Sequence, residues 1–239
     1  FGIDVEAVTQ NLKHHAGVIW DQKLFILGGE TEELVTNQVL VYDIDETGIT
    51  PSTYDFSNIF LARRHHAVAV WQNLLFIIGG EDASGNLLSS VEVYELQREG
   101  AVLRQGYPFP AIGPVKEHSL HLNGDDLILM GGLGYSAPVT NPALADDPTV
   151  LGSPLVFALS SDQALAKDSS GYPDLDTPRY GHAGVVHRNT LYLMGGTDGL
   201  TDFDSIEAYN FSVLGSAKID GDLLPSLSMG KRGASAVSF

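Results

Sequence analysis

The sequence contains no cysteine among its 239 residues. A chain without thiols cannot form disulfides, thiolate metal sites or a cysteine nucleophile. The absence leaves the compartment open, because many secreted bacterial proteins also do without disulfides. Between the alternatives, we favour a secreted or cell-surface location.

Basic residues are also scarce: Lys and Arg total 13 against 30 Asp and Glu, which gives a formal net charge of −17. This acidic balance disfavours binding to nucleic acid or to an anionic membrane, because phosphate groups attract clustered Lys and Arg. The simplest interpretation is that the acids keep a flat-faced β protein soluble. The uncharged run at residues 127–145 is about as long as a membrane span, but its three Gly, two Pro and one Asn argue against membrane insertion.

Common enzyme signatures are missing as well. The sequence has no G-x-S-x-G elbow, no H-E-x-x-H and no Walker A loop. The acidic segments "DIDETG" at 43–48 and "GDD" at 124–126 lack the ligand spacing of a calcium loop and predict β-turns instead. We therefore assign no catalytic residue, expect neither a metal nor a cofactor, and favour a non-enzymatic protein.

What the sequence does contain is a fourfold repeat. An apolar run followed by Gly-Gly occurs at Gly28, Gly79, Gly131 and Gly195, which are 51, 52 and 64 residues apart. A period of this length is typical of propellers and other stacked arrays. Other residues keep the same phase: a histidine precedes each first glycine by 13 residues, and an aromatic residue follows each pair. These residues are His15, His66, His118 and His182, and Tyr42, Tyr94, Phe157 and Tyr209.

Each repeat predicts a small antiparallel sheet. Segments such as "HHAVAV" predict a buried first strand, and a tight polar turn then leads to a second strand that ends on Gly-Gly. Absent Cβ atoms allow positive φ and close approach of a neighbouring backbone there. A third, alternating strand ends near the aromatic residue. Gly48, Gly100 and Gly215, each six residues after a Tyr, predict the turn into a fourth strand.

These residues resemble the Kelch repeat, in which an Arg and a His or small residue open the first strand, Gly-Gly closes the second, and Tyr lies in the third. The best copies are "TPRYGHAGVVHRNTLYLMGGTDG" at 177–199 with "DSIEAYNF", and "LARRHHAVAVWQNLLFIIGGED" at 61–82 with "SSVEVYEL". The resemblance covers roughly residues 10–239. The family's fourth-strand Trp is missing, since Trp20 and Trp71 lie in first-strand turns. We expect Tyr54, Tyr107 or Tyr172 to take over that packing.

The resemblance implies an all-β, Kelch-type β-propeller, with residues 1–239 forming one domain or a segment of one. We expect four four-stranded blades at approximately 10–58, 59–110, 111–174 and 175–225, with a partial unit at 226–239. Residues 1–9 take the place of a fourth strand from a preceding blade. We favour a segment of a six- or seven-bladed ring completed by other chain segments, because open sheet edges promote aggregation. The alternative is a small ring in which the terminal strands pair with neighbouring blades.

Binding residues are inferred from the resemblance, because Kelch propellers direct the start of the first strand and the residues after Gly-Gly toward one mouth of the channel. The first unit has Leu12 in place of the Arg, with Lys13 beside it, so the basic ring is incomplete. The positions carried over are Arg63, Arg179 and Lys116, the last displaced by one, together with Glu30, Glu81 and Asp198.

The third unit carries an insertion of roughly a dozen residues between Gly132 and Phe157. Long insertions in repeat arrays often project from the binding face. Tyr135, Asn141, Asp146 and Asp147 are therefore candidates for contact with a ligand or partner, and a tolerated surface loop is the alternative.

The four phased histidines suggest a metal ring, but equivalent positions on four blades are too far apart for one ion with ligands at ~2 Å. We predict that they are structural and that His14 and His65, each beside a phased histidine, lie on the surface. The predicted function is a non-enzymatic recognition or scaffolding module that binds a protein or glycan at one channel mouth. The resemblance leaves two alternatives: a carbohydrate-active, sialic-acid-epimerase-like propeller that uses Arg63, Arg179, Glu81 or His66, or an architectural part of a larger secreted or surface protein.

Overall fold

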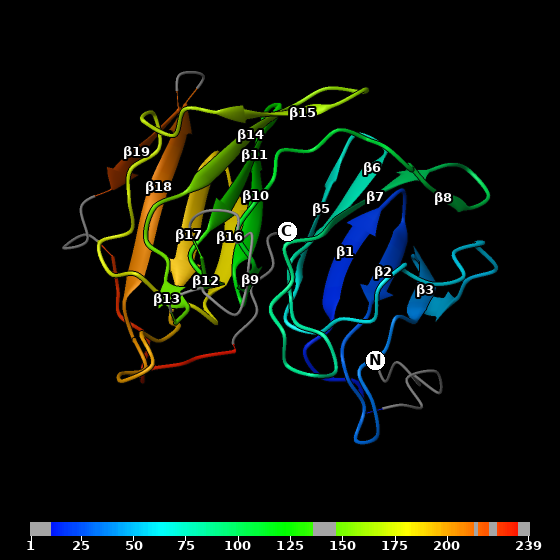
Figure 1. Ribbon diagram of the computed structural model, residues 1–239, viewed down its shortest axis with the longest axis horizontal. Coiled ribbons are helices and arrows are strands. Elements are labelled where there is room, and N and C mark those ends of the chain that lie inside the picture. Colours follow the sequence, from blue (N-terminus) through cyan, green and yellow to red (C-terminus); the bar gives the residue numbers. More distant parts are fainter. Residues whose placement is uncertain (1–10, 136–146, 213–214, 220–223, 234–239) are drawn as a thin grey trace. The chain divides into compact units, whose positions relative to one another are not determined.

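The computed structural model describes residues 11–135, 147–212, 215–219 and 224–233. Throughout these residues the regular elements are β-strands, as predicted, and no helix occurs (Figure 1). No helix that could span a membrane is therefore found in the described part of the chain. The chain divides into two compact units, Phe1–Gly106 and Tyr107–Phe239, which are described separately below.

The first unit contains two four-stranded antiparallel sheets, and in each of them the strands pair in the order of the sequence. The first sheet consists of β1 (Ala16–Trp20), β2 (Lys23–Leu27), β3 (Val39–Asp45) and β4 (Gly48–Pro51). The second sheet consists of β5 (Ala67–Trp71), β6 (Leu74–Ile78), β7 (Val91–Leu96) and β8 (Ala101–Leu103).

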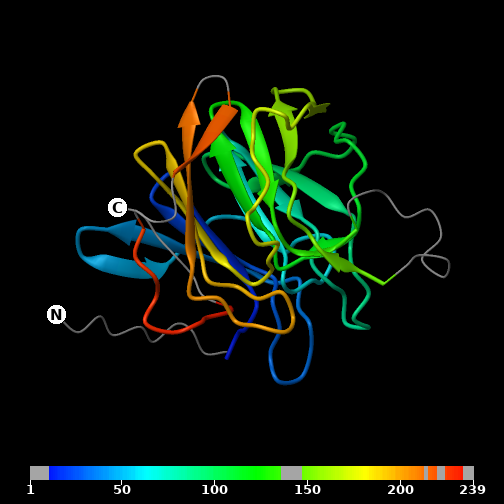
Figure 2. The same ribbon diagram turned by 90° about the vertical axis from the view of Figure 1, so that its left-hand side faces the viewer.

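The second unit repeats the pattern with two more four-stranded antiparallel sheets, the last of which is drawn in yellow to orange-red in Figures 1 and 2. The third sheet consists of β10 (Ser119–Asn123), β11 (Asp126–Met130), β14 (Leu155–Leu159) and β15 (Ala164–Lys167). The fourth sheet consists of β16 (Ala183–His187), β17 (Thr190–Met194), β18 (Ile206–Ser212) and β19 (Gly215–Ile219). A further three-stranded ladder combines β9 (Val115–Lys116) with two strands around the insertion, β12 (Leu133–Gly134) and β13 (Thr149–Val150).

The first two strands of each sheet are joined by a two-residue turn. Both residues have left-handed φ angles in the first and fourth sheets, where Asp21 and Gln22 have φ of 46° and 59° and Arg188 and Asn189 have 46° and 61°; in the other two turns only the first residue, Gln72 or Gly124, has a positive φ. Two positive φ angles define the turn whose twist matches a hairpin. The predicted tight turns are therefore present, and this edge of the sheets is called the turn end. The opposite edge, where the first strand begins and the second ends on Gly-Gly, is called the loop end.

The Gly-Gly pairs at the loop end join one sheet to the next within each unit. Gly29 N donates to Arg63 O at 2.8 Å, and Gly132 N donates to Arg179 O at 2.9 Å. A Cβ placed on Gly28 would lie 2.6 Å from Arg63 O and 2.8 Å from His66 Cε1. The phased histidine thus packs on the first glycine of the preceding sheet, a structural position as predicted.

The segment after the fourth sheet makes the same contact. Gly196 N donates to Lys231 O at 2.5 Å, and a Cβ on Gly195 would lie 2.4 Å from that oxygen. Lys231 therefore occupies the backbone position that Arg63 and Arg179 hold in the second and fourth sheets. Residues 231–233 dock on the fourth sheet as the start of a further repeat.

The core of each unit lies between its sheets, and all five side chains of β6 are buried. Tyr54 belongs to the first of these cores, where its ring packs edge-on against Phe25 with centroids 5.4 Å apart. However, Tyr54 lies beyond the end of β4, and its hydroxyl donates to Gly100 O at 2.8 Å. Tyr107 and Tyr172 likewise lie after β8 and β15. Tyr54 and Tyr172 thus pack in the cores, as expected, but they do so from the links between sheets rather than from the fourth strands.

Candidate partner-binding surface

Two of the predicted binding residues, Arg63 and Arg179, have no exposed surface. Arg63 Nη2 lies 2.5 Å from Glu92 Oε1, and Nη1 donates to Gly79 O at 2.8 Å. Arg179 repeats this arrangement with Glu207 and Gly195 O, at 2.5 and 2.8 Å. Each guanidinium therefore joins the second and third strands of its own sheet and has no exposed face to offer a ligand.

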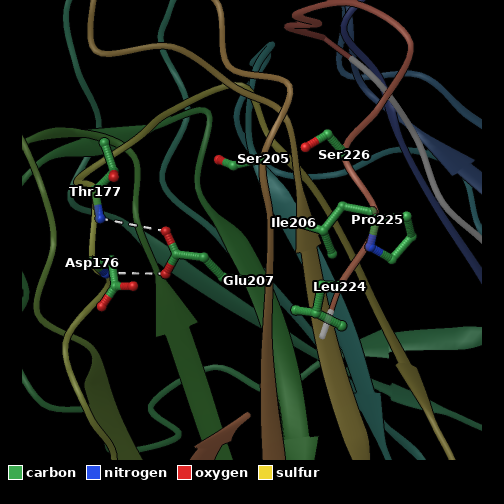
Figure 3. Close-up of a pocket in the computed structure, with 8 residues that line it drawn as sticks. All are labelled: Asp176, Thr177, Ser205, Ile206, Glu207, Leu224, Pro225 and Ser226. Atoms are coloured by element: carbon green, nitrogen blue, oxygen red, sulfur yellow. Dashed lines mark hydrogen bonds between the residues drawn. The ribbon is translucent and has the colours of Figure 1, made fainter. Parts of the chain in front are cut away.

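The glutamates of these ion pairs also hold the chain that enters their sheets. Glu92 accepts hydrogen bonds from Phe60 N at 2.8 Å and Leu61 N at 3.0 Å. Glu207 accepts the equivalent bonds from Asp176 N and Thr177 N, beside a cavity of about 170 Å³ (Figure 3). Buried carboxylates with this many donors are structural, because each oxygen is already satisfied.

The pairing can be recognised in the sequence once the partners are known. Where the first strand is preceded by the buried Arg, a Glu stands two residues before the third-strand Tyr. The other two repeats have apolar residues at both positions: Leu12 with Leu40, and Val115 with Leu155. In each repeat, the buried Arg and its Glu partner are therefore either both present or both absent.

In each repeat, the residue that follows the buried Arg position faces outward. We call Lys13, Arg64, Lys116 and Tyr180 the opening row, because each pairs through its backbone with the residue after Gly-Gly at the loop end. The pairs are Lys13 with Glu30, Arg64 with Glu81, Lys116 with Leu133, and Tyr180 with Thr197. Lys116, which seemed displaced by one in the sequence, is thus in register with this row. Arg64 is a candidate that sequence reasoning missed.

In the first unit, Arg64 of the opening row is part of an ionic cluster. We call it the Arg64 cluster, and its members are His14, Glu30, Arg64, His65 and Glu81. Arg64 Nε donates to Glu81 Oε1 at 2.7 Å, and its Nη1 donates to Glu30 Oε2. His14 Nδ1 lies 2.8 Å from the other oxygen of Glu30. The predicted residues Glu30 and Glu81 are therefore brought together, joined by a guanidinium rather than by a ligand.

Electrostatics favour the charged forms of Glu30 and Arg64 in this cluster. Burial raises the pKa of Glu30, but hydrogen bonds from Arg64 and His14 outweigh that effect, so its pKa lies below the ordinary value. The pKa of Arg64 is raised, chiefly by the hydrogen bond to Glu30. The cluster can therefore present fixed charges of both signs to a partner.

The two histidines of the Arg64 cluster stack with ring centroids 3.9 Å apart. His14 is 45% exposed at its side chain and His65 is 17% exposed, so His14 is the more accessible of the two. Both residues have left-handed backbones, with φ of 54° and 57°. Glu117 and Gly181, which precede the phased histidines of the other two blades, have φ of 54° and 63°, so this left-handed backbone is a feature of the repeat.

The predicted residues of the second unit are more scattered. Asp198 is exposed, and its carboxylate closes a turn by accepting hydrogen bonds from Leu200 N and Thr201 N at 2.8 and 2.7 Å. Tyr135 is half-buried with its N–H bonded to Pro114 O, whereas Asp147 is exposed. Asn141 and Asp146 lie outside the described residues.

A polar network between β10 and β16 contains the phased histidines of the second unit. His121 Nε2 and His182 Nε2 each lie 2.8 Å from Ser119 Oγ, and His118 is buried beside them. Burial lowers the pKa of His118 and His121 to about 3 and that of His182 to about 4. Within the described ranges, no three or more His, Cys, Asp or Glu side chains gather as a metal-ligand set.

Residues 13–212 match the family model described as the KLHDC2/KLHL20/DRC7 Kelch-repeats domain. The chain belongs to the Kelch-repeat family. The glycine pairs that dock successive sheets and the four-stranded antiparallel pattern are thus those of Kelch β-propeller blades. Kelch-repeat domains typically act as protein-binding scaffolds.

Curated relatives agree with this assignment. The chain is 26% identical to alpha-scruin of Limulus polyphemus over 202 residues, which cover 82% of this chain and 20% of that protein. It is 26% identical to acyl-CoA-binding domain-containing protein 4 of Arabidopsis thaliana, over 84% of this chain and 28% of that protein. Human Kelch-like protein 15 is 24% identical over 60% of this chain and 26% of its own length. The chain therefore spans less than a third of each of these relatives.

Proposed function

We propose that this Kelch-repeat protein is a non-enzymatic recognition or scaffolding module that binds a protein partner at the loop end of its blades. The observation that carries the proposal is that neighbouring residues at the start of each blade have different roles, one structural and one exposed. Arg63 and Arg179 are buried and hold the sheet together, whereas the side chains of the opening row differ between repeats and are at least partly exposed, although Glu81 and Thr197, with which two of them pair, are buried. Variable side chains on a repeated scaffold are the usual basis of recognition in repeat proteins.

The Arg64 cluster supports the same proposal in the first unit. Its guanidinium, its stacked imidazoles and the Glu30 carboxylate are partly exposed, the Glu81 carboxylate is buried, and hydrogen bonds join Arg64 to both carboxylates. Charged groups that are held in place before binding favour specific partners, because little side-chain entropy is lost on association. The excess of acids over the whole chain makes nucleic acid an unsuitable partner.

A carbohydrate-active function is less well supported. It requires a pocket in which an acid and a base approach one substrate atom within ~3 Å. The cavity beside Glu207 is lined by two carboxylates, Glu207 and Asp176, and by no Lys, Arg or His, and the oxygens of Glu207 already accept four hydrogen bonds. A second cavity of about 150 Å³, between residues 110–112 and β14, has no carboxylate in its lining. Incubation with N-acetylneuraminic acid should leave its anomer exchange at the uncatalysed rate when followed by NMR.

The proposal is tested by locating a bound partner. Random linear peptides displayed on phage are selected against the full chain, and the enriched peptides are synthesised. Hydrogen–deuterium exchange of the complex should show protection in the opening row and in the segments after Gly-Gly, with scrambled peptides as controls. Protection confined to the turn end or to the outer strands β4, β8, β15 and β19 would refute the proposal.

A further inference from the structure

The turn that follows Gly195-Gly196 displays an apolar side chain to solvent. We call residues 197–202 the Leu200 turn, after the leucine at its tip, which is 95% exposed. Single exposed apolar residues are common on protein surfaces. Leu200 is more exposed than Leu34, at 56% the exposed leucine of the turn after Gly28-Gly29, and both lie at the loop end, where the proposed function places the partner.

Hydrogen bonds fix the backbone of the Leu200 turn. Thr197, itself buried, donates its hydroxyl to Thr201 O at 2.8 Å and accepts from Gly199 N at 3.0 Å. The Asp198 carboxylate also accepts hydrogen bonds from Leu200 N and Thr201 N. The leucine is therefore presented on an ordered backbone, which lowers the entropy lost when a partner covers it.

The fold does not need a leucine at this place. The corresponding turn of the second blade is closed in the same manner, by Asp82 Oδ1, which accepts from Ser84 N and Asn86 N at 2.8 and 2.9 Å. Residues 83–85 at its tip are Ala, Ser and Gly. A small, polar tip thus closes the same kind of turn, and Leu200 adds nothing that the turn requires.

A second exposed apolar side chain belongs to the segment that docks beside this turn. Met229 is 58% exposed, and a Cβ on the following Gly230 would lie 2.2 Å from Asp202 O. The neighbouring Lys231 N donates to Phe203 O at 3.0 Å. The chain at Met229 therefore runs against the end of the Leu200 turn, and both apolar side chains belong to one region of the surface.

Acidic residues surround these two side chains. Asp198, Asp202 and Asp204 are all exposed, and they outnumber the two exposed basic residues of the docked segment, Lys231 and Arg232, of which Arg232 lies 3.8 Å from Asp202. A second copy of this chain, with its net charge of −17, would be repelled by this region, as would an anionic lipid surface. Charge complementarity instead favours a partner that carries Lys or Arg.

We propose that the Leu200 turn and Met229 form a docking site for a protein segment that carries an apolar side chain flanked by Lys or Arg. This inference rests on the proposed function and names the chemistry of the partner. The apolar side chain would cover Leu200 and Met229, and the basic residues would lie against the aspartates. A buried apolar anchor ringed by charged contacts is the common organisation of a binding hot spot.

The test compares the full chain with its Leu200→Ser variant in parallel selections of phage-displayed random peptides. Peptides enriched by the wild-type chain alone should share an apolar residue beside Lys or Arg. In fluorescence polarisation, Leu200→Ser should weaken their binding about tenfold. Asp198→Asn keeps the oxygen that closes the turn but removes the charge, so it should weaken binding about threefold and flatten its salt dependence. Leu165→Ser, the same change at an exposed site on β15, should have no effect.

Two results would overturn the inference. One is a selection that yields no peptide whose binding depends on Leu200, and the other is enriched peptides without basic residues. Peptides that bind Leu200→Ser unchanged but protect the opening row in hydrogen exchange would leave the proposed function standing. Peptides that protect the turn end alone would refute both. Equal melting temperatures of the wild-type and Leu200→Ser chains would confirm that any loss of binding reflects the missing side chain.

Discussion

At the scale of single residues, the glycine pairs do two kinds of work. They adopt left-handed backbones, and they let a neighbouring segment of backbone approach to a distance that excludes a Cβ. Gly80, with φ of 93°, shows both, since a Cβ there would lie 2.6 Å from Arg64 O and 2.9 Å from His66 Cβ. Gly85, with φ of 81°, would meet nothing within 4 Å. Comparing Gly80 with Gly85 therefore distinguishes the effect of backbone strain from the effect of crowding.

This separation predicts unequal effects of alanine. Gly85→Ala should cost about 1 kcal/mol of unfolding free energy, the penalty of a left-handed alanine. Gly80→Ala should cost about 3 kcal/mol or more, because it also pushes the entering strand of its own blade out of register with β6. Urea unfolding followed by circular dichroism measures both. Equal losses would mean that close approach at Gly-Gly does not hold the blade together.

At the scale of one blade, the same buried position is filled in two ways, by an ion pair or by two apolar side chains. The second blade has the buried pair Arg63 and Glu92, whereas the first has Leu12 and Leu40. Removing one partner of a buried ion pair leaves the other buried without a counter-charge, which typically costs about 3–5 kcal/mol. Replacing both partners by apolar residues is often tolerated. The apolar solution already exists in this protein, so the second blade should be able to adopt it.

Arg63→Leu and Glu92→Leu should each destabilise the chain by about 3 kcal/mol or more, whereas the double variant should recover at least about 2 kcal/mol of their sum. The recovery stays incomplete because Leu61 N loses its acceptor and Phe60 N keeps only the Tyr94 hydroxyl. Arg104→Leu, which breaks a half-exposed pair with Glu95 in the same blade, should cost less than about 1 kcal/mol. Additive losses in a thermodynamic cycle of urea unfolding would show that Arg63 and Glu92 are not coupled.

At the scale of the whole molecule, the repeated residues predicted the fold but not the direction of every side chain. Recurring Gly-Gly, His and Tyr positions were enough to predict sheets and their strand order. The buried position of Arg63 was not predictable from alternation, because His65 has a left-handed φ of 57° and interrupts the strand's period of two before β5 begins. The ladder of β9, β12 and β13 also escaped prediction, since two-residue strands have no periodicity to read.

The second unit should respond to acid more strongly than the first, in which burial also lowers the pKa of His15 and His66 is buried. His118, His121 and His182 are all buried in the second unit, with pKa values of about 3, 3 and 4 because burial disfavours the charged ring. Charge repulsion adds to this effect, from His182 on the other two rings and from Arg179 on His182. Ser119 contributes a neutral hydroxyl between two of them.

An unfolded chain returns these imidazoles to a pKa of about 6.5, so it binds more protons than the folded chain once the pH falls below that value. Stability is therefore complete above pH ~6.5 and is lost as the pH falls toward the folded values, by up to about 1.4 kcal/mol per pH unit for each histidine. Asp82 and Asp198 stay ionised through the upper part of this window, because hydrogen bonds from Asn86 and from Thr201 N lower their pKa values.

His121→Val is the sharpest test of this acid response, because Val18 and Val185 take the same place in the first and fourth blades. The variant should lose less stability than the wild-type chain between pH 7 and pH 5 in urea unfolding, by about 2 kcal/mol. Hydrogen exchange at pH 5 should show β10 and β16 of the wild-type chain opening before β1 and β5. Equal pH slopes for the two chains, or earlier opening of the first unit, would show that the buried imidazoles do not govern how this Kelch-repeat protein responds to acid.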